Sequence, residues 1–224
     1  MSSLKEPYFT PETIADKAMN MLRSLDEFTR RRSVLFAPER SALLLLDMQA
    51  YFLQESSHAF VPSATAILSG VNALVQAFSD RNLPIFLTRH VNTPQDAGQM
   101  ATWWRYLLSP DDPLSLIEPR LKIGDGILID KTRYDAFQDT PLESLLQDRG
   151  VRQLIICGVM THLCCETTAR SAFMRGFEVF FTVDGTATYN ESFHRASLLN
   201  LAHGFATPIL VQNILSALEK RDVG

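Results

Sequence analysis

The sequence has few cysteines and no long apolar run. Its 224 residues contain three cysteines, at positions 157, 164 and 165. Two adjacent cysteines and one other make a poor disulfide framework, so we expect a reducing, cytoplasmic setting in which packing or chemistry explains each thiol. No segment approaches the roughly 20 apolar residues that a membrane-spanning helix needs. The polar residues 1–10 do not resemble a secretory signal.

A strong excess of one charge is also missing. The formal net charge is −4, and acidic and basic residues are interspersed. No basic face stands out, so we expect no nucleic-acid partner. We interpret the one basic cluster, the three arginines at residues 30–32, as a solvated helix end. The sequence shows no repeat, low-complexity tract or interdomain linker, and 46% of its residues are apolar. This composition predicts one α/β domain with a sizeable core.

Short apolar runs alternate with helical periodicity from residue 41 onward. Strands that are apolar throughout and alternate with helices indicate a parallel sheet covered on both faces. We therefore predict a three-layer α-β-α sandwich with a six-stranded, mainly parallel, doubly wound sheet. The predicted strands are residues 42–47, 83–88, 126–130, 153–159, 178–184 and 208–211, and the predicted helices are residues 64–79, 141–147, 161–175, 191–203 and 215–221.

Residues 1–35 precede this alternation and are predicted to form an N-terminal helical arm, with residues 36–224 as the α/β domain. Within residues 11–31, apolar side chains such as Ile14, Ala18 and Met21 recur at helical spacing. The arm is not needed for the alternation of strands and helices. We interpret it as packing on the domain or on a neighbouring subunit of a homo-oligomer, a dimer or a tetramer.

Three reactive side chains lie at predicted strand ends. Asp47 ends the first strand, Lys131 follows the third, and Cys164 follows the fourth. In doubly wound sheets, ligands bind beyond the carboxyl ends of the strands. Because those ends share one edge of a parallel sheet, the three side chains are predicted to converge there.

Cys164 is the candidate nucleophile. It lies in the first turn of the predicted helix over residues 161–175, where unpaired N–H groups and the helix dipole lower a cysteine pKa. The same N–H groups can receive the oxyanion of a tetrahedral intermediate. A buried structural thiol is the alternative. Cys165 competes for the role but is turned by about 100° around the helix, and we interpret Cys165 and Cys157 as packing residues.

The other two strand-end residues also leave alternatives open. Asp47 is either a turn residue or a general base that takes the cysteine proton and later returns it to the leaving group. Lys131 is either a surface residue or a cation that favours the ionised Asp47. Arg133 has a planar fork that suits a substrate carboxylate, or it pairs with a surface acid.

Residues 91–122 form a long irregular segment that contains Trp103, Trp104 and Tyr106. Segments of this length are usually functional or disordered, and three aromatic residues argue against disorder. We predict that at least one of the two tryptophans reaches the pocket, facing Phe52 and Tyr134. The alternative is that both tryptophans only pack against the protein or form a subunit contact.

Three motifs resemble those of the isochorismatase-like hydrolases. They are Leu45-Leu46-Asp47-Met48-Gln49-Ala50-Tyr51-Phe52, Asp130-Lys131-Thr132-Arg133-Tyr134-Asp135-Ala136-Phe137, and Cys157-Gly158-Val159-Met160-Thr161-His162-Leu163-Cys164-Cys165. The resemblance extends from about residue 36 to the C-terminus. It implies a parallel six-stranded sheet with flanking helices.

The same resemblance implies roles for the site residues. Asp47 is the implied general base, Lys131 its electrostatic partner and Cys164 the nucleophile, because the family's nucleophile stands six residues after the motif glycine. A cis peptide between Val159 and Met160 is also implied. It turns the backbone N–H groups of Met160 and Cys164 toward the substrate oxygen, as an oxyanion hole. The predicted substrate-binding residues are Phe52, Arg89, Trp103, Trp104, Arg133, Tyr134 and Thr161.

The family resemblance implies two chemistries. We favour a cysteine hydrolase that cleaves a C–N bond of a small amide, ureide or carbamoyl compound through a thioester acyl-enzyme. The first alternative is an isochorismatase-type vinyl ether hydrolase with Asp47 as the acid. The second is a non-catalytic binding or scaffold protein on the same fold. Residues 89–92 lack the Asp-x-His pair of a nicotinamidase metal site, and a lone His90 offers too few ligands. We therefore predict no metal and no cofactor, and disfavour a nicotinamidase.

Overall fold

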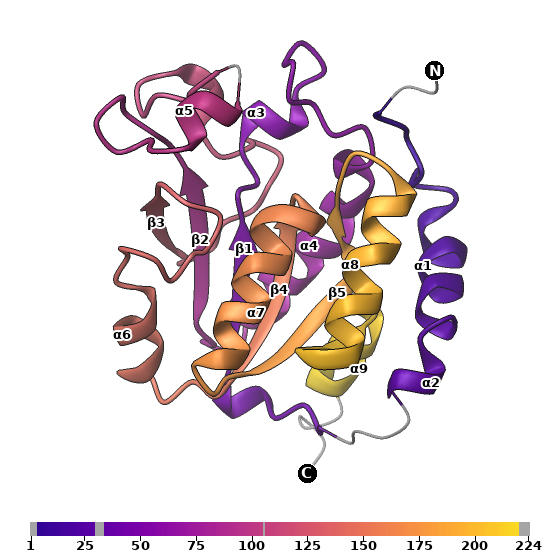
Figure 1. Cartoon of the computed structure of the whole chain (residues 1–224). Helices are drawn as coiled ribbons and strands as arrows, with labels where there is room; N and C mark the ends of the chain where they lie inside the picture. The colour runs from indigo at the N-terminus through magenta and orange to yellow at the C-terminus, as the bar shows by residue number, and fades with distance from the viewer. Residues whose placement is uncertain (1–3, 30–33, 105, 220–224) are drawn as a thin grey trace.

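The computed structural model describes residues 4–29, 34–104 and 106–219, which form a six-stranded sheet between two layers of helices (Figure 1). The strand order is β3-β2-β1-β4-β5-β6, and every neighbouring pair is parallel. This confirms the predicted doubly wound sandwich, and the sheet is parallel throughout. The strands are β1 Ser41–Leu46, β2 Ile85–His90, β3 Ile127–Lys131, β4 Gln153–Val159, β5 Glu178–Ala187 and β6 Thr207–Ile209.

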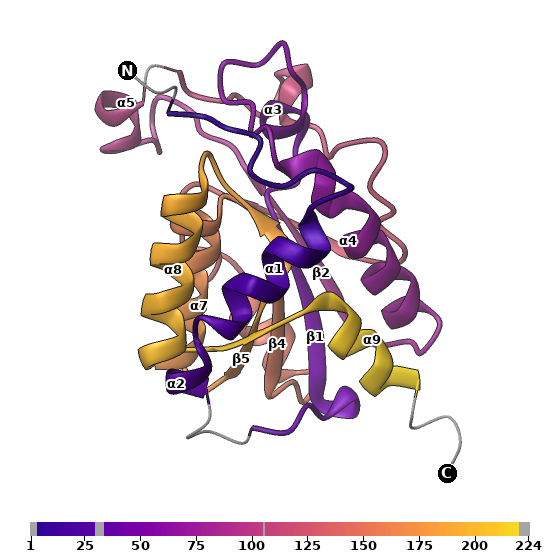
Figure 2. The ribbon, with the colours of Figure 1, turned by 90° about the vertical axis from the view of Figure 1, so that its right-hand side faces the viewer.

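Helices cover both faces of this sheet. Figure 2 shows α4 and α9 on one side of the strands and α7 and α8 on the other. Two short helices, α3 and α5, lie at the carboxyl edge of the strands, at the top of Figure 1. The helices after the N-terminal arm are α3 Ala50–Leu53, α4 Ala64–Ser79, α5 Met100–Trp103, α6 Leu142–Gln147, α7 Glu166–Met174, α8 Glu191–Gly204 and α9 Val211–Glu219.

The central strands β1 and β4 are buried along their whole length, which explains their uninterrupted apolar sequence. Their register pairs Leu46 with Gly158 at the carboxyl edge. Gly158 has a φ of 116°, and a Cβ atom added there would lie 2.1 Å from the carbonyl oxygen of Leu46. Glycine is therefore required at this position, where the chain leaves β4 and begins the turn that carries Cys164.

The first and the last helices differ from those predicted. The single helix expected over residues 11–31 is two helices, α1 Ile14–Arg23 and α2 Asp26–Thr29, and residues 30–32 lie outside the described part of the chain. Between the two helices, the hydroxyl of Ser24 donates to the carbonyl of Met21 at 2.6 Å, a local bond that competes with helix continuation. Helix α9 begins at Val211 rather than at residue 215, because its first N–H donates to Asp184 on β5, 2.8 Å away.

The N-terminal arm packs on its own domain, beside the sheet (Figure 2). Tyr8, Phe9 and Met21 are buried in the same apolar core as the strands. The phenol oxygen of Tyr8 lies 2.7 Å from Nδ1 of His194, on α8, and accepts the backbone N–H of Thr188 at 3.0 Å. The arm therefore packs on the domain, one of the two predicted packing modes, whereas a contact with a neighbouring subunit and the division of the chain at residues 35 and 36 stay predictions. Among the described residues, none of the helices has the length and apolar character needed to cross a membrane.

Candidate active site

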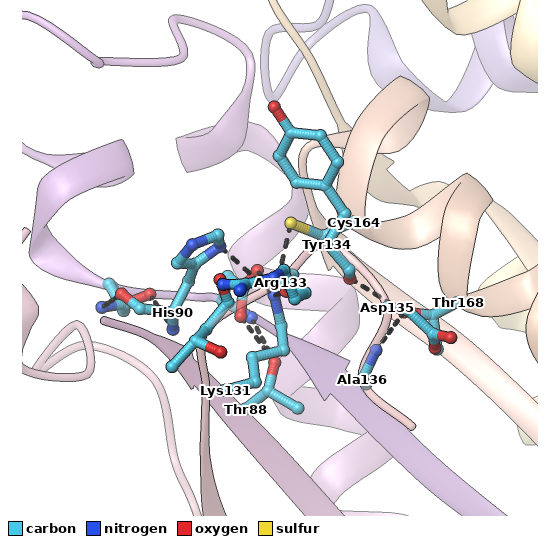
Figure 3. A network of polar contacts seen from close by, with 12 residues as sticks. Thr88, His90, Lys131, Arg133, Tyr134, Asp135, Ala136, Cys164 and Thr168 are labelled. Carbon is cyan, nitrogen blue, oxygen red and sulfur yellow. Dashed lines mark hydrogen bonds and ion pairs between the residues drawn. The ribbon is translucent and has the colours of Figure 1, made fainter. Parts of the chain in front are cut away.

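Asp47, Lys131 and Cys164 converge at the carboxyl edge of the sheet. Nζ of Lys131 lies 2.8 Å from Oδ2 of Asp47 and 3.4 Å from Sγ of Cys164. Figure 3 shows the Lys131 nitrogen between the surrounding polar groups, with the Cys164 sulfur above it. The side chains of Asp47 and Lys131 are fully buried, and Cys164 is 4% exposed. The three strand ends named from the sequence therefore form one cluster.

Side chains from the two strands next to β1 on one side, β2 and β3, hold the carboxylate of Asp47. Strand β2 separates β3 from β1, so the Lys131 side chain crosses the end of β2 to reach Asp47. Thr88, on β2, accepts the backbone N–H of Asp47 at 3.2 Å and donates its hydroxyl to Oδ1 at 2.6 Å. Asp47 itself has a φ of 52°, the left-handed conformation that aspartate tolerates better than most residues. Thr88 and Lys131 thus hold the two carboxylate oxygens separately.

The turn that carries Cys164 differs from the expected helix N-terminus. The peptide between Val159 and Met160 is cis, as the family resemblance implied. Residues Thr161–Cys165 form a π-helical turn, and α7 begins only at Glu166. Cys164 therefore precedes the α-helix instead of lying in its first turn.

The protonation states follow from burial and from the three neighbouring charges. Burial alone would raise the pKa of Asp47, but the Lys131 ammonium brings this pKa below its ordinary value. Burial alone would lower the pKa of Lys131, but the Asp47 carboxylate raises it. Burial raises the pKa of the Cys164 thiol, and the negative charge of Asp47 raises it further. The resting site is a carboxylate, an ammonium and a neutral thiol, so the expected lowering of the Cys164 pKa is wrong for this state.

His90 lies beside the same cluster, although the sequence showed it only as a lone histidine. Ligand atoms of Asp47, His90 and Cys164 all lie within 4.8 Å of one another, and within residues 4–29, 34–104 and 106–219 this is the group of three that could hold a metal ion. Nζ of Lys131, however, contacts all three residues, with Nδ1 of His90 at 3.5 Å. A buried ammonium at the centre of the group disfavours a cation there. Burial and Lys131 lower the pKa of His90 to about 4, so its ring is neutral near pH 7.

A cavity of about 380 Å³ opens onto the cluster. Cys164 and His90 line it, together with Met160 and Asn92. Its volume suits a small organic molecule, and its walls are predominantly apolar, as in most small-molecule sites. The aromatic residues of the wall are Tyr51, Phe52, Trp103, Trp104, Tyr106, Tyr134 and Tyr189.

Four of the seven predicted substrate-binding residues line this cavity: Phe52, Trp103, Trp104 and Tyr134. The indole N–H of Trp104 donates to the phenol oxygen of Tyr134 at 2.7 Å, which joins the long segment to the lysine motif. Both tryptophans thus reach the cavity, as the sequence predicted of at least one. Trp103 is 78% exposed, so it forms the outer rim.

The other three predicted residues lie outside the cavity lining. Arg89 forms a two-pronged ion pair with Asp130, with both N–O distances at 2.7 Å. Arg133 donates to the backbone carbonyls of Asp96 and Thr132, at 2.6 and 2.9 Å, and so braces the loop after β3. Thr161 is fully buried in the turn before α7. The side chains of Arg89 and Arg133 are therefore bound to protein groups, and Thr161 is enclosed in its turn, so none of the three faces the cavity.

Sequence reasoning missed several residues of the site. His90 ends strand β2, and Thr88 ends the strand predicted over residues 83–88, so the strand-end rule that found Asp47 points to both residues. His58, Leu4 and Lys5 line the cavity from loops and from the N-terminal arm. No periodicity or motif marks these three residues, because folding alone brings them to the cavity.

Replacement of the two tryptophans by alanine is expected to lower kcat/KM to different extents. Trp104 is 37% exposed and hydrogen-bonded to Tyr134, whereas Trp103 is 78% exposed. We expect Trp104→Ala to lower kcat/KM by about tenfold or more, because the wall loses an aromatic face and a fixed Tyr134. Trp103→Ala should have a smaller kinetic effect, and neither should lower Tm by more than a few degrees. Wild-type kinetics in both variants together with a large loss of Tm would show that the tryptophans only pack.

Comparison with known proteins identifies the family. Residues 41–213 match the family model described as the isochorismatase domain. The chain therefore belongs to the isochorismatase-like hydrolases, the class of enzyme whose motifs it resembles.

Relatives within this family differ in activity. Nicotinamidase 3 of Arabidopsis thaliana is 40% identical over 171 residues, which cover 74% of this chain and 82% of that protein. Enterobactin synthase component B of Escherichia coli strain K12 is 30% identical over 185 residues, which cover 81% of this chain but 65% of that protein, less than two thirds of its length. The crystal structure of a cysteine hydrolase from Pseudomonas syringae pv. phaseolicola 1448A has a TM-score of 0.80 and 25% identity, and the match covers 84% of this chain and 96% of that one. These relatives define a hydrolase family but no single substrate.

Proposed function

We propose that this chain is a cysteine hydrolase that cleaves a C–N bond of a small amide, ureide or carbamoyl compound. The observation that carries the proposal is the contact of Lys131 with both Asp47 and Cys164, at 2.8 and 3.4 Å, beside a cavity that Cys164 lines. A nucleophile, a base and a buried cation within reach of one cavity are the components of covalent hydrolysis.

In the proposed reaction, Asp47 transfers one proton in each half: the thiol proton to the departing nitrogen, and then a water proton to the released Cys164 sulfur. Sγ of Cys164 attacks the carbonyl carbon as its proton passes to the Asp47 carboxylate, which forms a tetrahedral oxyanion. The oxyanion collapses to a thioester, and protonated Asp47 gives the proton to the departing nitrogen. Water, deprotonated by Asp47, then attacks the thioester and releases the carboxylic acid and the Cys164 thiol. Lys131 stabilises the charged states of its two neighbours throughout.

We assign the oxyanion hole to the backbone N–H groups of Met160 and Cys164. The support is their position: both residues line the cavity, with Met160 immediately before the π-helical turn Thr161–Cys165 and Cys164 within it. Gly158 supports the same turn, since its conformation lets the chain leave β4 beside Leu46. Donors placed in advance at the carbonyl oxygen stabilise the charge that develops in the transition state.

The second candidate is vinyl ether hydrolysis, with Asp47 as the acid and Cys164 only lining the pocket. The match of residues 41–213 to the family model described as the isochorismatase domain favours it. Against it, the Lys131 ammonium outweighs burial and holds the pKa of Asp47 below its ordinary value. An aspartate that is ionised near pH 7 suits a base better than an acid. The third candidate is a non-catalytic scaffold. It does not explain why a buried ion pair contacts a thiol that lines a cavity.

An ammonia-release panel and a thiol reagent separate the two chemistries. The panel contains nicotinamide, N-carbamoylsarcosine and ureidoacrylate, and we expect release from at least one compound. Alkylation of Cys164 by iodoacetamide should abolish that release. If the alkylated protein still hydrolyses isochorismate and no amide releases ammonia, the vinyl ether chemistry replaces our proposal.

We also propose a homo-oligomer, a dimer or tetramer, in a cytoplasmic setting, and a small molecule rather than a macromolecule as the substrate. The size of the cavity supports the last point. The first two rest on the sequence and stay predictions.

A further inference from the structure

His90 is held in place beside the candidate triad. It lines the cavity, and Nδ1 of its ring lies 3.5 Å from Nζ of Lys131 (Figure 3). The fully buried side chain of Gln49 holds the backbone of His90 in two places: Oε1 accepts the N–H at 2.8 Å, and Nε2 donates to the carbonyl at 3.1 Å. The position of His90 is therefore fixed by the same segment that carries Asp47.

Asn92 determines which nitrogen of the His90 ring carries the proton. Nδ2 of Asn92 donates to Oδ1 of Asp96 at 3.0 Å and to the carbonyl of Thr132 at 3.1 Å. Both amide hydrogens are thus committed, and Oδ1 of Asn92 faces Nε2 of His90 at 3.0 Å. An amide oxygen can only accept, so Nε2 is the protonated nitrogen. Because burial lowers the pKa of His90 to about 4, the ring is neutral near pH 7 and Nδ1 is left as an acceptor.

The Lys131 ammonium has more acceptors around it than protons to donate. A lysine ammonium has three N–H donors. Four acceptor atoms lie within reach of Nζ: Oδ2 of Asp47 at 2.8 Å, the carbonyl oxygen of Arg133 at 2.9 Å, Sγ of Cys164 at 3.4 Å and Nδ1 of His90 at 3.5 Å. The two oxygens are nearest and take two of the protons. The sulfur and the ring nitrogen therefore compete for the third.

We propose that His90 is a positioning residue whose Nδ1 takes the third Lys131 proton when the sulfur of Cys164 is acylated. This assignment rests on the proposed function and adds a residue to its acyl-enzyme stage. The lone pairs of a thioester sulfur are shared with the carbonyl group, so this sulfur accepts hydrogen bonds poorly. Since Lys131 is fully buried, a donor left without an acceptor would destabilise the acyl-enzyme. Nδ1 of His90 prevents this and keeps the ammonium beside Asp47.

Methyl methanethiosulfonate supplies a stable substitute for the acylated sulfur. Sγ of Cys164 attacks the divalent sulfur of the reagent, a disulfide bond forms, methanesulfinate leaves, and the thiol proton passes to the buffer. The added methylthio group contains no oxygen or nitrogen, and its sulfur is a weak acceptor. Tandem mass spectrometry identifies the modified residue, and Cys157 and Cys165 are absent from the cavity lining. The modified protein thus mimics the acyl-enzyme without any substrate.

The measurement is the change of Tm on methylthiolation, compared between wild type and variants. In His90→Leu the acceptor is missing, so methylthiolation should lower Tm by about 5 °C more than in wild type. His90→Asn places an amide oxygen near the position of Nδ1 and should remove most of this extra loss. A purely structural role of the ring would lower Tm equally with and without the methylthio group.

His58→Leu is the matched control. It also removes a histidine from the cavity wall, but Nε2 of His58 lies 3.0 Å from the phenol oxygen of Tyr51, and the printed contacts of Lys131 do not include it. Methylthiolation should therefore lower the Tm of His58→Leu by as much as it lowers that of wild type.

A spectroscopic measurement needs no substitution in the protein under test. In wild type with isotope-labelled histidine, nitrogen NMR at pH 7 should show a protonated Nε2 and an unprotonated Nδ1 for His90. The spectrum of His90→Asn assigns the signals. After methylthiolation the Nδ1 signal should move to lower frequency, the direction that a stronger accepted hydrogen bond produces.

Each outcome decides the assignment. A protonated Nδ1 in wild type, an Nδ1 signal that does not move, an equal loss of Tm in wild type and His90→Leu, or no reaction at Cys164 would overturn it. If His90→Leu does not fold, the nitrogen spectra of wild type decide. The ammonia-release panel tests the proposed function separately. The expected spectra without any amide hydrolysis would keep the contact of His90 with Lys131 and refute the hydrolase proposal, whereas hydrolysis with an unmoved Nδ1 signal would do the reverse.

Discussion

Cys164→Ala should abolish hydrolysis of the amide substrate while the fold stays intact. Removing the nucleophile of a covalent mechanism typically lowers kcat by about 10⁴-fold or more. Cys164 is 4% exposed and small, so its replacement by alanine leaves little empty volume. We expect a Tm within a few degrees of wild type. The measurements are ammonia release under saturating substrate and thermal unfolding followed by circular dichroism.

Cys165→Ala is the matched control for this experiment. Cys165 is fully buried, lies next to Cys164 in the same turn, and is absent from the cavity lining. Its replacement should leave kcat within about threefold of wild type. Full activity in Cys164→Ala would end the covalent mechanism, and loss of activity in Cys165→Ala alone would mean that the wrong cysteine was assigned.

Asp47→Asn should lower both activity and stability. The amide cannot take the thiol proton, so kcat should fall by about 10³-fold or more. The fully buried Lys131 also loses its partner at 2.8 Å. Breaking a buried ion pair by removing one charge typically costs about 3–5 kcal/mol of the free energy of unfolding. Denaturant unfolding of the wild type and the variant at pH 7 measures this difference.

The pH dependence of this stability difference has a definite sign. Burial opposes ionisation of Asp47, but Lys131 lowers its pKa in the folded state below the ordinary value of 3.8. A depressed carboxyl pKa adds stability above the pKa of the unfolded chain, and that stability is lost as the pH falls through the folded-state value. The gap between wild type and Asp47→Asn should therefore be full at pH 7 and shrink below about pH 4.

A double variant separates the ion pair from simple loss of packing. Asp47→Asn combined with Lys131→Met removes both buried charges, so it should be less destabilised than the sum of the two single variants. Additive losses of unfolding free energy would show that the two charges do not depend on each other. Neither the double variant nor Lys131→Met should retain appreciable hydrolysis.

The sequence was enough to locate the candidate catalytic cluster, because strand ends in a parallel sheet lie together whatever the details of packing. Asp47 follows β1, Lys131 ends β3 and Cys164 lies in the turn after β4, and in a parallel sheet those ends share one edge. The six strands, their parallel arrangement and the family were also predicted, since strands buried on both faces must be apolar throughout. The same rule also points to Thr88 and His90, in the last three residues of β2: Thr88 contacts Asp47, and His90 contacts Lys131.

The pKa values and ion pairs of the site depend on burial and on neighbouring charges, which local sequence patterns do not reveal. A position after β4 suggested a helix dipole and a reactive thiolate, but Cys164 precedes α7 and is buried beside the Asp47 carboxylate, so burial and then that charge raise its pKa. Arg89 looked available for a substrate, yet β2 and β3 place it beside Asp130. A pKa or an ion pair depends on neighbours from several strands, and packing determines those neighbours.

Local sequence patterns thus determined which residues lie at the strand ends, and hence the fold class and the edge of the sheet at which the candidate triad lies. Only the tertiary structure decided what surrounds that edge: the order of β3, β2 and β1 that makes Lys131 cross to Asp47, the tryptophans that line the cavity, and Lys5 carried there by the N-terminal arm. The physical reason is the range of the interactions. Hydrophobic periodicity records whether a residue faces the core, whereas a cavity wall is assembled from segments that are distant in the chain and share no period.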